Sequence, residues 1–150
     1  MGKGISLTSV ETNKRIVHRF DELLNTRELD LLDGLCTSDM VNHSLSHHRP
    51  IGLEGTRQYL STNGKAFQTD RWRECKVVAE DDFVVQFGIR EGRWPGGTFR
   101  GVPLREGHYD REFAVMYRIA GGRIAERWAV RDDFNMIVEL GETTPSEHAS

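Results

Sequence analysis

Three histidines lie close together between Met40 and Pro50, in the string MVNHSLSHHRP, and the whole chain has only six. His43 and His47 are four residues apart, a spacing at which two imidazoles on a helix can share a metal ion. Two serines and Pro50 favour an irregular backbone, however, and no cysteine or acidic residue falls at ligand spacing nearby. We therefore predict no metal site, and we interpret His47 and His48 as residues of a polar loop.

Asn42 and His43 form a second possible site, because both follow a short predicted helix. The imidazole of His43 can act as a base near neutral pH, and the amide of Asn42 can hold a carbonyl or enolate oxygen. Both side chains can equally satisfy backbone groups of a loop. The sequence leaves these two interpretations open.

The elements that must position these residues change in periodicity along the chain. Thr8 and Glu11 form a capping-box pattern before an apolar helical stripe that includes Phe20. Two shorter helices follow, in RELDLLDGL and GLEGTRQYLSTNGKAF. Four strands with a period of two come next, and a last helix in DDFNMIVELG is capped by Asp132 or Asp133. Helices that precede hairpin-connected strands indicate an α+β fold: a cone-shaped α+β barrel whose curved antiparallel sheet wraps around the N-terminal helices.

Composition narrows the class of protein. The chain has 150 residues, which fits one domain over 1–150, with an ordered core of about 8–141 and a polar tail at 142–150. A net charge of −3 gives no basic surface for nucleic acid, and no apolar run is long enough for a signal peptide or a membrane span. Cys36 and Cys75 form no disulfide framework. We expect a cytoplasmic protein.

Four strings of the chain resemble the SnoaL-like polyketide cyclases, within the nuclear-transport-factor-2-like superfamily. They are DMVNH (39–43), GLEGTRQYL (52–60), FRGVP (99–103) and GGRIAERWAVRDDFNMIVELG (121–141). The resemblance implies a cofactor-independent enzyme that closes a ring in a bulky, mostly apolar small molecule of polyketide-type secondary metabolism. It also implies a homodimer. The fold carries many activities, so the chemistry must come from the residues of the site.

The resemblance also shows a departure from the family. The aspartate that acts as general acid/base on the last strand of those cyclases aligns with Ala129, and Phe113 and Val115 occupy the supporting polar positions. Asn42 is the pocket residue that is kept. A methyl group transfers no proton, so the acid/base mechanism cannot be carried over residue by residue.

The strand faces provide candidates for the pocket. Arg127 can polarise a substrate carbonyl or can be a solvated arginine, and Tyr117 can donate to an oxyanion or can be a core residue. With Asn42 and His43, these two complete the candidate catalytic set. The candidate substrate-binding residues are Trp72, Val85, Phe87, Tyr109, Phe113, Val115 and Ala129.

Three functions remain open at this stage. The first is ring closure chiefly by the shape of the cavity, pericyclic or conventional, which needs no proton shuttle. The second is a dehydratase or isomerase that uses His43 as its base. The third is a non-catalytic, dimeric module that binds a hydrophobic ligand.

Overall fold

The computed structural model describes residues 9–45, 51–67 and 69–141. Thr8, His47, His48, Pro50 and the tail at 142–150 lie outside the described residues, so the predictions made for them remain predictions. The helices and the 3₁₀ turn are α1 (Ser9–Thr26), the turn Leu29–Leu31, α2 (Leu32–Leu35), α3 (Leu53–Ala66) and α4 (Asp133–Leu140). The strands are β1 (Cys36–Asn42), β2 (Thr69–Glu80), β3 (Phe83–Trp94), β4 (Gly97–Phe99), β5 (Val102–Leu104), β6 (Gly107–Ala120) and β7 (Arg123–Arg131).

The helices form where the apolar pattern predicts them. The stripe of α1 is buried as expected, with Val17, Phe20 and Leu23 almost fully inaccessible. The last helix begins at the predicted cap, because the side chain of Asp132 accepts a hydrogen bond of 3.0 Å from the backbone N–H of Asn135. Helix α1 packs against β2, β3 and β7, and helix α4 packs against β6 and β5.

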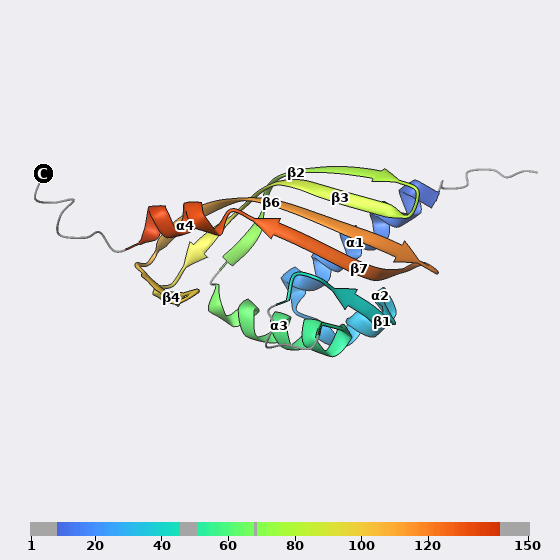
Figure 1. The fold of residues 1–150 in the computed structure, drawn as a ribbon, viewed down its shortest axis with the longest axis horizontal. Helices are drawn as coiled ribbons and strands as arrows, with labels where there is room; N and C mark the ends of the chain where they lie inside the picture. Colours follow the sequence, from blue (N-terminus) through green and yellow to red (C-terminus); the bar gives the residue numbers. More distant parts are fainter. Residues whose placement is uncertain (1–8, 46–50, 68, 142–150) are drawn as a thin grey trace, which may run out of the picture.

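The main sheet has the strand order β1-β7-β6-β3-β2 and bends over α1, α2 and α3, which lie along one of its sides (Figure 1). The predicted α+β class is confirmed, but the sheet is mixed rather than wholly antiparallel. Strand β1 pairs parallel to β7, with Asn42 opposite Arg127. The sequence CTSDMVN is short and half polar, so its period predicted no strand. Asn42 therefore ends an edge strand rather than following a helix.

The residues of β3 that face the helices are the opposite set from the one predicted to line the pocket. Val84, Gln86 and Arg90 are buried, whereas Phe87 is 53% exposed. Both faces of β3 carry apolar residues over part of the strand, so the alternation alone does not show which face is the inner one. Pairing decides it: Gln86 lies opposite Val115 on β6, and cross-strand partners share a face.

The absence of a side chain at Gly88 allows β2 to lie close to β3. A Cβ at Gly88 would lie 1.9 Å from the backbone oxygen of Glu74, where the β2–β3 register shifts between Trp72 and Glu74. The missing side chain lets the bulged strand approach closely. As a result, Trp72 and Asp70 at the start of β2 turn toward the same side as Arg90.

Candidate active site

A cavity of about 670 Å³ lies on the helix-covered side of the sheet. Its lining comes from α1, α3, the β4–β5 region and the inner faces of β2, β3, β6 and β7. The lining includes charged, polar and apolar side chains, among them Asp21, Leu24, Ser44, Phe67, Asp70, Trp72, Gln86, Arg90, Arg100, Arg111, Phe113, Val115, Tyr117, Arg127 and Arg131. This volume suits a drug-sized or larger organic molecule, and binding sites of this kind are mostly apolar with a few polar groups.

Five of the predicted site residues line this cavity. Trp72, Phe113 and Val115 provide apolar surface, and the rings of Trp72 and Phe113 meet edge to face at 5.7 Å. Tyr117 and Arg127 lie opposite one another on β6 and β7, with the guanidinium 5.8 Å from the ring centroid. These five residues lie together along the cavity, and their roles in binding or catalysis remain predictions.

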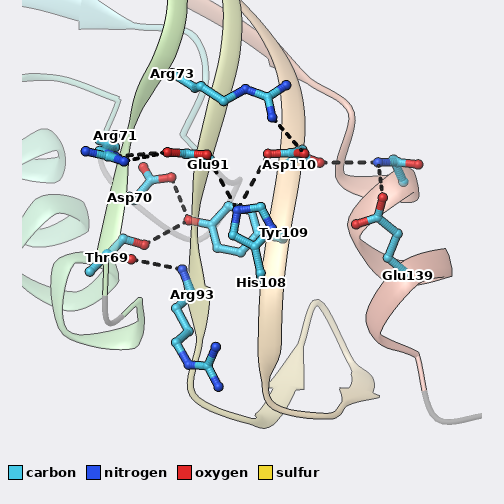
Figure 2. Close-up of polar contacts among 11 residues, drawn as sticks. Thr69, Asp70, Arg71, Arg73, Glu91, Arg93, His108, Tyr109, Asp110 and Glu139 are labelled. Carbon is cyan, nitrogen blue, oxygen red and sulfur yellow. Dashed lines mark hydrogen bonds and ion pairs between the residues drawn. The ribbon is translucent and has the colours of Figure 1, made fainter.

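Tyr109 is fully buried beside the cavity but is not part of its lining. Its hydroxyl donates to Asp70 Oδ1 at 2.6 Å and also lies 3.1 Å from the carbonyl oxygen of Thr69, as Figure 2 shows. Burial and the neighbouring Asp70 charge raise the pKa of Tyr109 far above its usual range. Tyr109 thus holds Asp70 in place and has no direct access to a ligand.

Three other predicted binding residues also lie outside the lining. Phe87 and Val85 point to the opposite face of the sheet, because the register of β3 is inverted relative to the prediction. Ala129 lies opposite Val115 on the cavity side of β7, but its methyl group packs against the main core and does not reach the cavity. Val85, Phe87 and Ala129 therefore lie outside the cavity lining in which the sequence analysis had placed them.

Asn42 has a structural role in this arrangement. Its buried amide donates to Thr56 Oγ1 at 3.2 Å, and its carbonyl oxygen accepts from the backbone N–H and hydroxyl of Ser44. These contacts connect β1 to α3 and fix Ser44, which does line the cavity. Asn42 is thus a positioning residue for its neighbour.

His43 lies on the outer face of the sheet. Its Nε2 is 2.8 Å from Glu126 Oε2, and its ring stacks on Trp128 at 4.8 Å. The side chain is 40% exposed and takes no part in the lining. Because successive side chains of an extended segment point to opposite faces, the side chain after buried Asn42 points away from the cavity. The geometry does not support the hypothesis that His43 is the catalytic base.

Asp21 is the carboxyl group that the sequence analysis missed. It projects from α1 into the cavity, where Gln86 Nε2 donates to its Oδ2 at 2.5 Å. Burial raises the pKa of Asp21, although the Gln86 hydrogen bond and the Arg90 charge act in the other direction. A signal was available, since Asp21 lies four residues after buried Val17 and three before Leu24, at the edge of the apolar stripe.

Tyr117 and Arg127 offer hydrogen-bond donors in the same cavity. Burial raises the pKa of Tyr117 to about 12, so its hydroxyl keeps its proton at neutral pH. Arg127 Nη1 donates to Ser44 Oγ at 3.1 Å, and its buried Nε has no partner among the described residues. The charges of Arg127 and Asp21 influence the same hydroxyl, so the three groups act on one region of the cavity.

The opposite part of the cavity wall is an ion network that the sequence analysis also missed. Arg90 Nε donates to Asp70 Oδ2 at 2.9 Å, and Arg111 bridges Asp70 and Asp133. Charged residues on neighbouring strands give no short-range signal, since only the register brings Arg90 opposite Arg111.

The lining contains no set of metal ligands within the described residues, because Asp21 and Asp70 are its carboxylates and it has no histidine or cysteine. Glu91, His108 and Asp110 do cluster on the outer face, with ligand atoms within 4.8 Å of one another. Arg71 and Arg73 already pair with these carboxylates, as Figure 2 shows. In the described segments, no helix is both long and apolar enough to cross a membrane.

Comparison with known proteins supports the fold and the family. The sequence profile of the SnoaL-like polyketide cyclases matches residues 14–140. A SnoaL-like polyketide cyclase from Agrobacterium tumefaciens strain C58 superposes with a TM-score of 0.74 at 19% identity, over 86% of this chain and 98% of that one.

Two Streptomyces proteins have similar structures. IdmH from Streptomyces antibioticus, a candidate polyketide cyclase, gives a TM-score of 0.72 at 22% identity, over 85% of this chain and 96% of that one. TsrD from Streptomyces laurentii gives 0.73 at 18% identity, over 91% and 98%. Identities this low establish the shared fold, and no curated protein matches the chain by sequence.

Proposed function

Because the chain belongs to the SnoaL-like polyketide cyclase family, we propose that it closes a ring in a polyketide-type substrate, without a cofactor, and that Asp21 is its general acid/base. The observation that carries this proposal is the carboxyl group of Asp21, which lines a cavity with aromatic walls and has a pKa raised by burial. A carboxyl tuned upward exchanges protons with carbon acids and alcohols more effectively at neutral pH than an exposed one.

The groups around Asp21 support an aldol-type closure. Ionised Asp21 removes a proton from a carbon next to a substrate carbonyl, and the negative charge moves onto that carbonyl oxygen. Arg127 and Tyr117 are the donors that can stabilise this enolate. The enolate carbon then bonds to a second carbonyl carbon, the C=O π bond breaks, and the new alkoxide takes the proton back from Asp21.

The shape of the cavity contributes in parallel. Leu24, Phe67, Trp72 and Phe113 give it apolar walls against which a flexible chain can fold. Holding the two reacting carbons in contact can remove several kcal/mol of the barrier, on the order of 7 kcal/mol in favourable cases. In this arrangement Asp21 replaces the acid that the family carries at the position of Ala129.

Substitution of Asp21 by Asn tests the proposal, since Asn keeps the size and can still accept from Gln86. Linear poly-β-keto substrates, as free acids and as methyl esters, are incubated with protein, and cyclised product is measured by mass spectrometry. We expect Asp21→Asn to lower turnover by about 10²–10⁴-fold while substrate binding is retained. His43→Ala, whose side chain lies outside the cavity, should match the wild type.

Each outcome distinguishes a mechanism. Full turnover by Asp21→Asn would contradict the acid/base role and would leave closure by shape alone, including a pericyclic route. Loss of turnover in His43→Ala alone would revive a dehydratase or isomerase that uses His43. Ligand binding without any conversion by the wild type would indicate a non-catalytic binding module.

We also propose that two copies associate through the outer face of the sheet, in a cytoplasmic homodimer. Two apolar cross-strand rows run across this face: Val78, Val85, Met116 and Trp128 in one, and Phe87, Ala114 and Val130 in the other. Val78, Phe87 and Val130 are 62%, 53% and 69% exposed in the single chain. A contiguous apolar surface of this kind favours self-association.

Light scattering after size-exclusion chromatography tests the dimer. Phe87→Lys places a charge in the middle of the outer face and should give a monomer. Leu31→Lys is the matched control, because Leu31 is 51% exposed on the helical side. A monomeric wild type, or dimeric Phe87→Lys, would contradict the proposed interface.

A further inference from the structure

The cavity wall is far more basic than the chain as a whole, which has a net charge of −3. Six arginines and two aspartates line the cavity, and Asp133 pairs with three of these arginines from behind. Positive charges thus exceed negative ones by three in this small region. We call four of these residues the arginine cluster: Arg90, Arg100, Arg111 and Arg131.

Asp133 is shared by three members of the cluster. Its Oδ2 lies 2.7 Å from Arg100 Nε and 3.4 Å from Arg131 Nε, and its Oδ1 accepts from Arg111 Nη1 at 2.9 Å. One carboxylate cannot neutralise three guanidinium groups. A positive charge therefore remains at this end of the cavity after the internal ion pairs are formed.

Asp70 serves the other side of the cluster in the same way. Its Oδ2 accepts from Arg90 at 2.9 Å, and its Oδ1 lies 3.4 Å from Arg111 Nη2 while also accepting from Tyr109. Four guanidinium groups therefore share two carboxylates.

Arg111 lies at the centre of the cluster and is the least accessible member. Its side chain is only 5% exposed, yet Asp70, Tyr109 and Asp133 hold its pKa above the ordinary value despite the cost of burial. Its buried Nε has no partner among the described residues. A buried donor of a charged group without an acceptor is unfavourable, so an acceptor delivered by a ligand would be favoured.

We propose that the arginine cluster is a subsite for a carboxylate, so that the substrate of the cyclase is a polyketide-type acid rather than a neutral ester. This inference rests on the proposed function and specifies its substrate class. Guanidinium groups bind planar carboxylates through paired hydrogen bonds. The acid group is held at the cluster, and the reacting carbons then lie toward Asp21.

Aromatic rings beside the cluster can hold the apolar body of such an acid. The guanidinium of Arg111 lies 5.0 Å from the ring centroid of Phe67, and that of Arg90 lies 5.1 Å from Trp72. Arg131 lies 5.7 Å from Phe113. The same rings line the cavity, so a ligand with a flat apolar part and an acid group matches both features.

Calorimetry with 2-naphthoate and methyl 2-naphthoate tests the subsite, because the two probes differ only in the charge of the acid group. We expect the acid to bind about ten-fold or more tightly than the ester at low salt, and salt to reduce the difference.

Arg131→Gln should weaken binding of the acid about ten-fold and leave the affinity for the ester unchanged. Arg100→Gln, which alters a half-exposed side chain, gives the same readout if Arg131→Gln fails to fold. Arg123→Gln, exposed and outside the cavity, is the control.

Equal affinities for acid and ester, or an unchanged affinity in both cluster variants, would overturn the subsite. Tighter binding of 2-naphthyl phosphate than of 2-naphthoate would overturn the assignment to carboxylates. These results are independent of turnover: a failed subsite leaves the Asp21→Asn test intact, and loss of the acid/base role leaves the affinity difference intact.

Discussion

Asp21 and Glu126 show how the two sides of the sheet differ. Each carboxylate accepts a side-chain hydrogen bond, from Gln86 in one case and from Arg118 in the other. Burial raises the pKa of Asp21, whereas the contacts with His43 and Arg118 lower the pKa of Glu126. The cavity side thus holds a carboxyl prepared for proton transfer, and the outer side holds one fixed as a charge.

The same contrast appears within the cavity. Asp21 accepts a hydrogen bond from Gln86, while Asp70 and Asp133 each contact two or more guanidinium groups. These ion pairs suit Asp70 and Asp133 to holding the arginine cluster in place. Asp21, whose pKa is raised by burial, is the residue to which the proposed mechanism assigns proton transfer.

The largest effect that can test the comparison is the pH dependence of turnover. Asp21 must be ionised to act as a base, so kcat/KM should fall about ten-fold per pH unit as the pH drops below its pKa. The midpoint should lie above 3.8, the ordinary pKa of an aspartate, since burial raises the pKa of Asp21. His43→Ala and Glu126→Gln should leave the profile unchanged. A profile that shifts in these outer-face variants would contradict the assignment of chemistry to the cavity side.

Stability should show the next largest effect, at the ion network. Asp133→Asn preserves shape but leaves three guanidinium groups short of an anion, and we expect a loss of about 3–5 kcal/mol in the free energy of unfolding. Urea denaturation measures it. Asp39→Asn is the control, because Asp39 is exposed on β1 and lies outside the network. Similar stabilities for the two variants would show that the network does not support the fold.

Particular residues show how far the sequence could predict this molecule. The stripe of α1, the cap at Asp132 and the alternation of β6 depend on local spacing, and all were predicted correctly. The inner face of β3 and the parallel strand β1 depend on contacts between distant segments: Val85 and Phe87, assigned to the pocket, lie on the outer face, and β1 was not predicted. Local periodicity gives the spacing of side chains on an element but does not say which face meets the core.

The site followed the same rule. Phe113, Tyr117 and Arg127 were assigned to the pocket from the alternation of long strands, and Trp72 was assigned because it flanks the predicted sheet; all four line the cavity. Asp21 was missed because a charged residue on a helix is usually solvated, and its place in the cavity depends on contacts with distant residues such as Gln86. The three histidines between Met40 and Pro50 attracted attention by their number, yet His43, the one among them that the structure describes, lies on the outer face of the sheet.

The smallest effect we expect is a pH-dependent difference in stability with opposite signs on the two sides of the sheet. The folded-state pKa of Asp21 is raised, so the folded protein binds more protons than the unfolded chain between pH 3.8 and that pKa. Stability should therefore fall as the pH rises through this window, and Asp21→Asn should gain stability over the wild type there.

The pKa of Glu126 is lowered, so its contribution to stability is present above its unfolded pKa of 4.5 and is lost as the pH falls through its folded pKa. Thermal melts of wild type, Asp21→Asn and Glu126→Gln across pH 3 to 8 should thus diverge in opposite directions, because removing Asp21 relieves a buried charge and removing Glu126 deletes a paired one. If the melting temperatures of the two variants shift in the same direction with pH, the opposite pKa shifts of Asp21 and Glu126 would be contradicted.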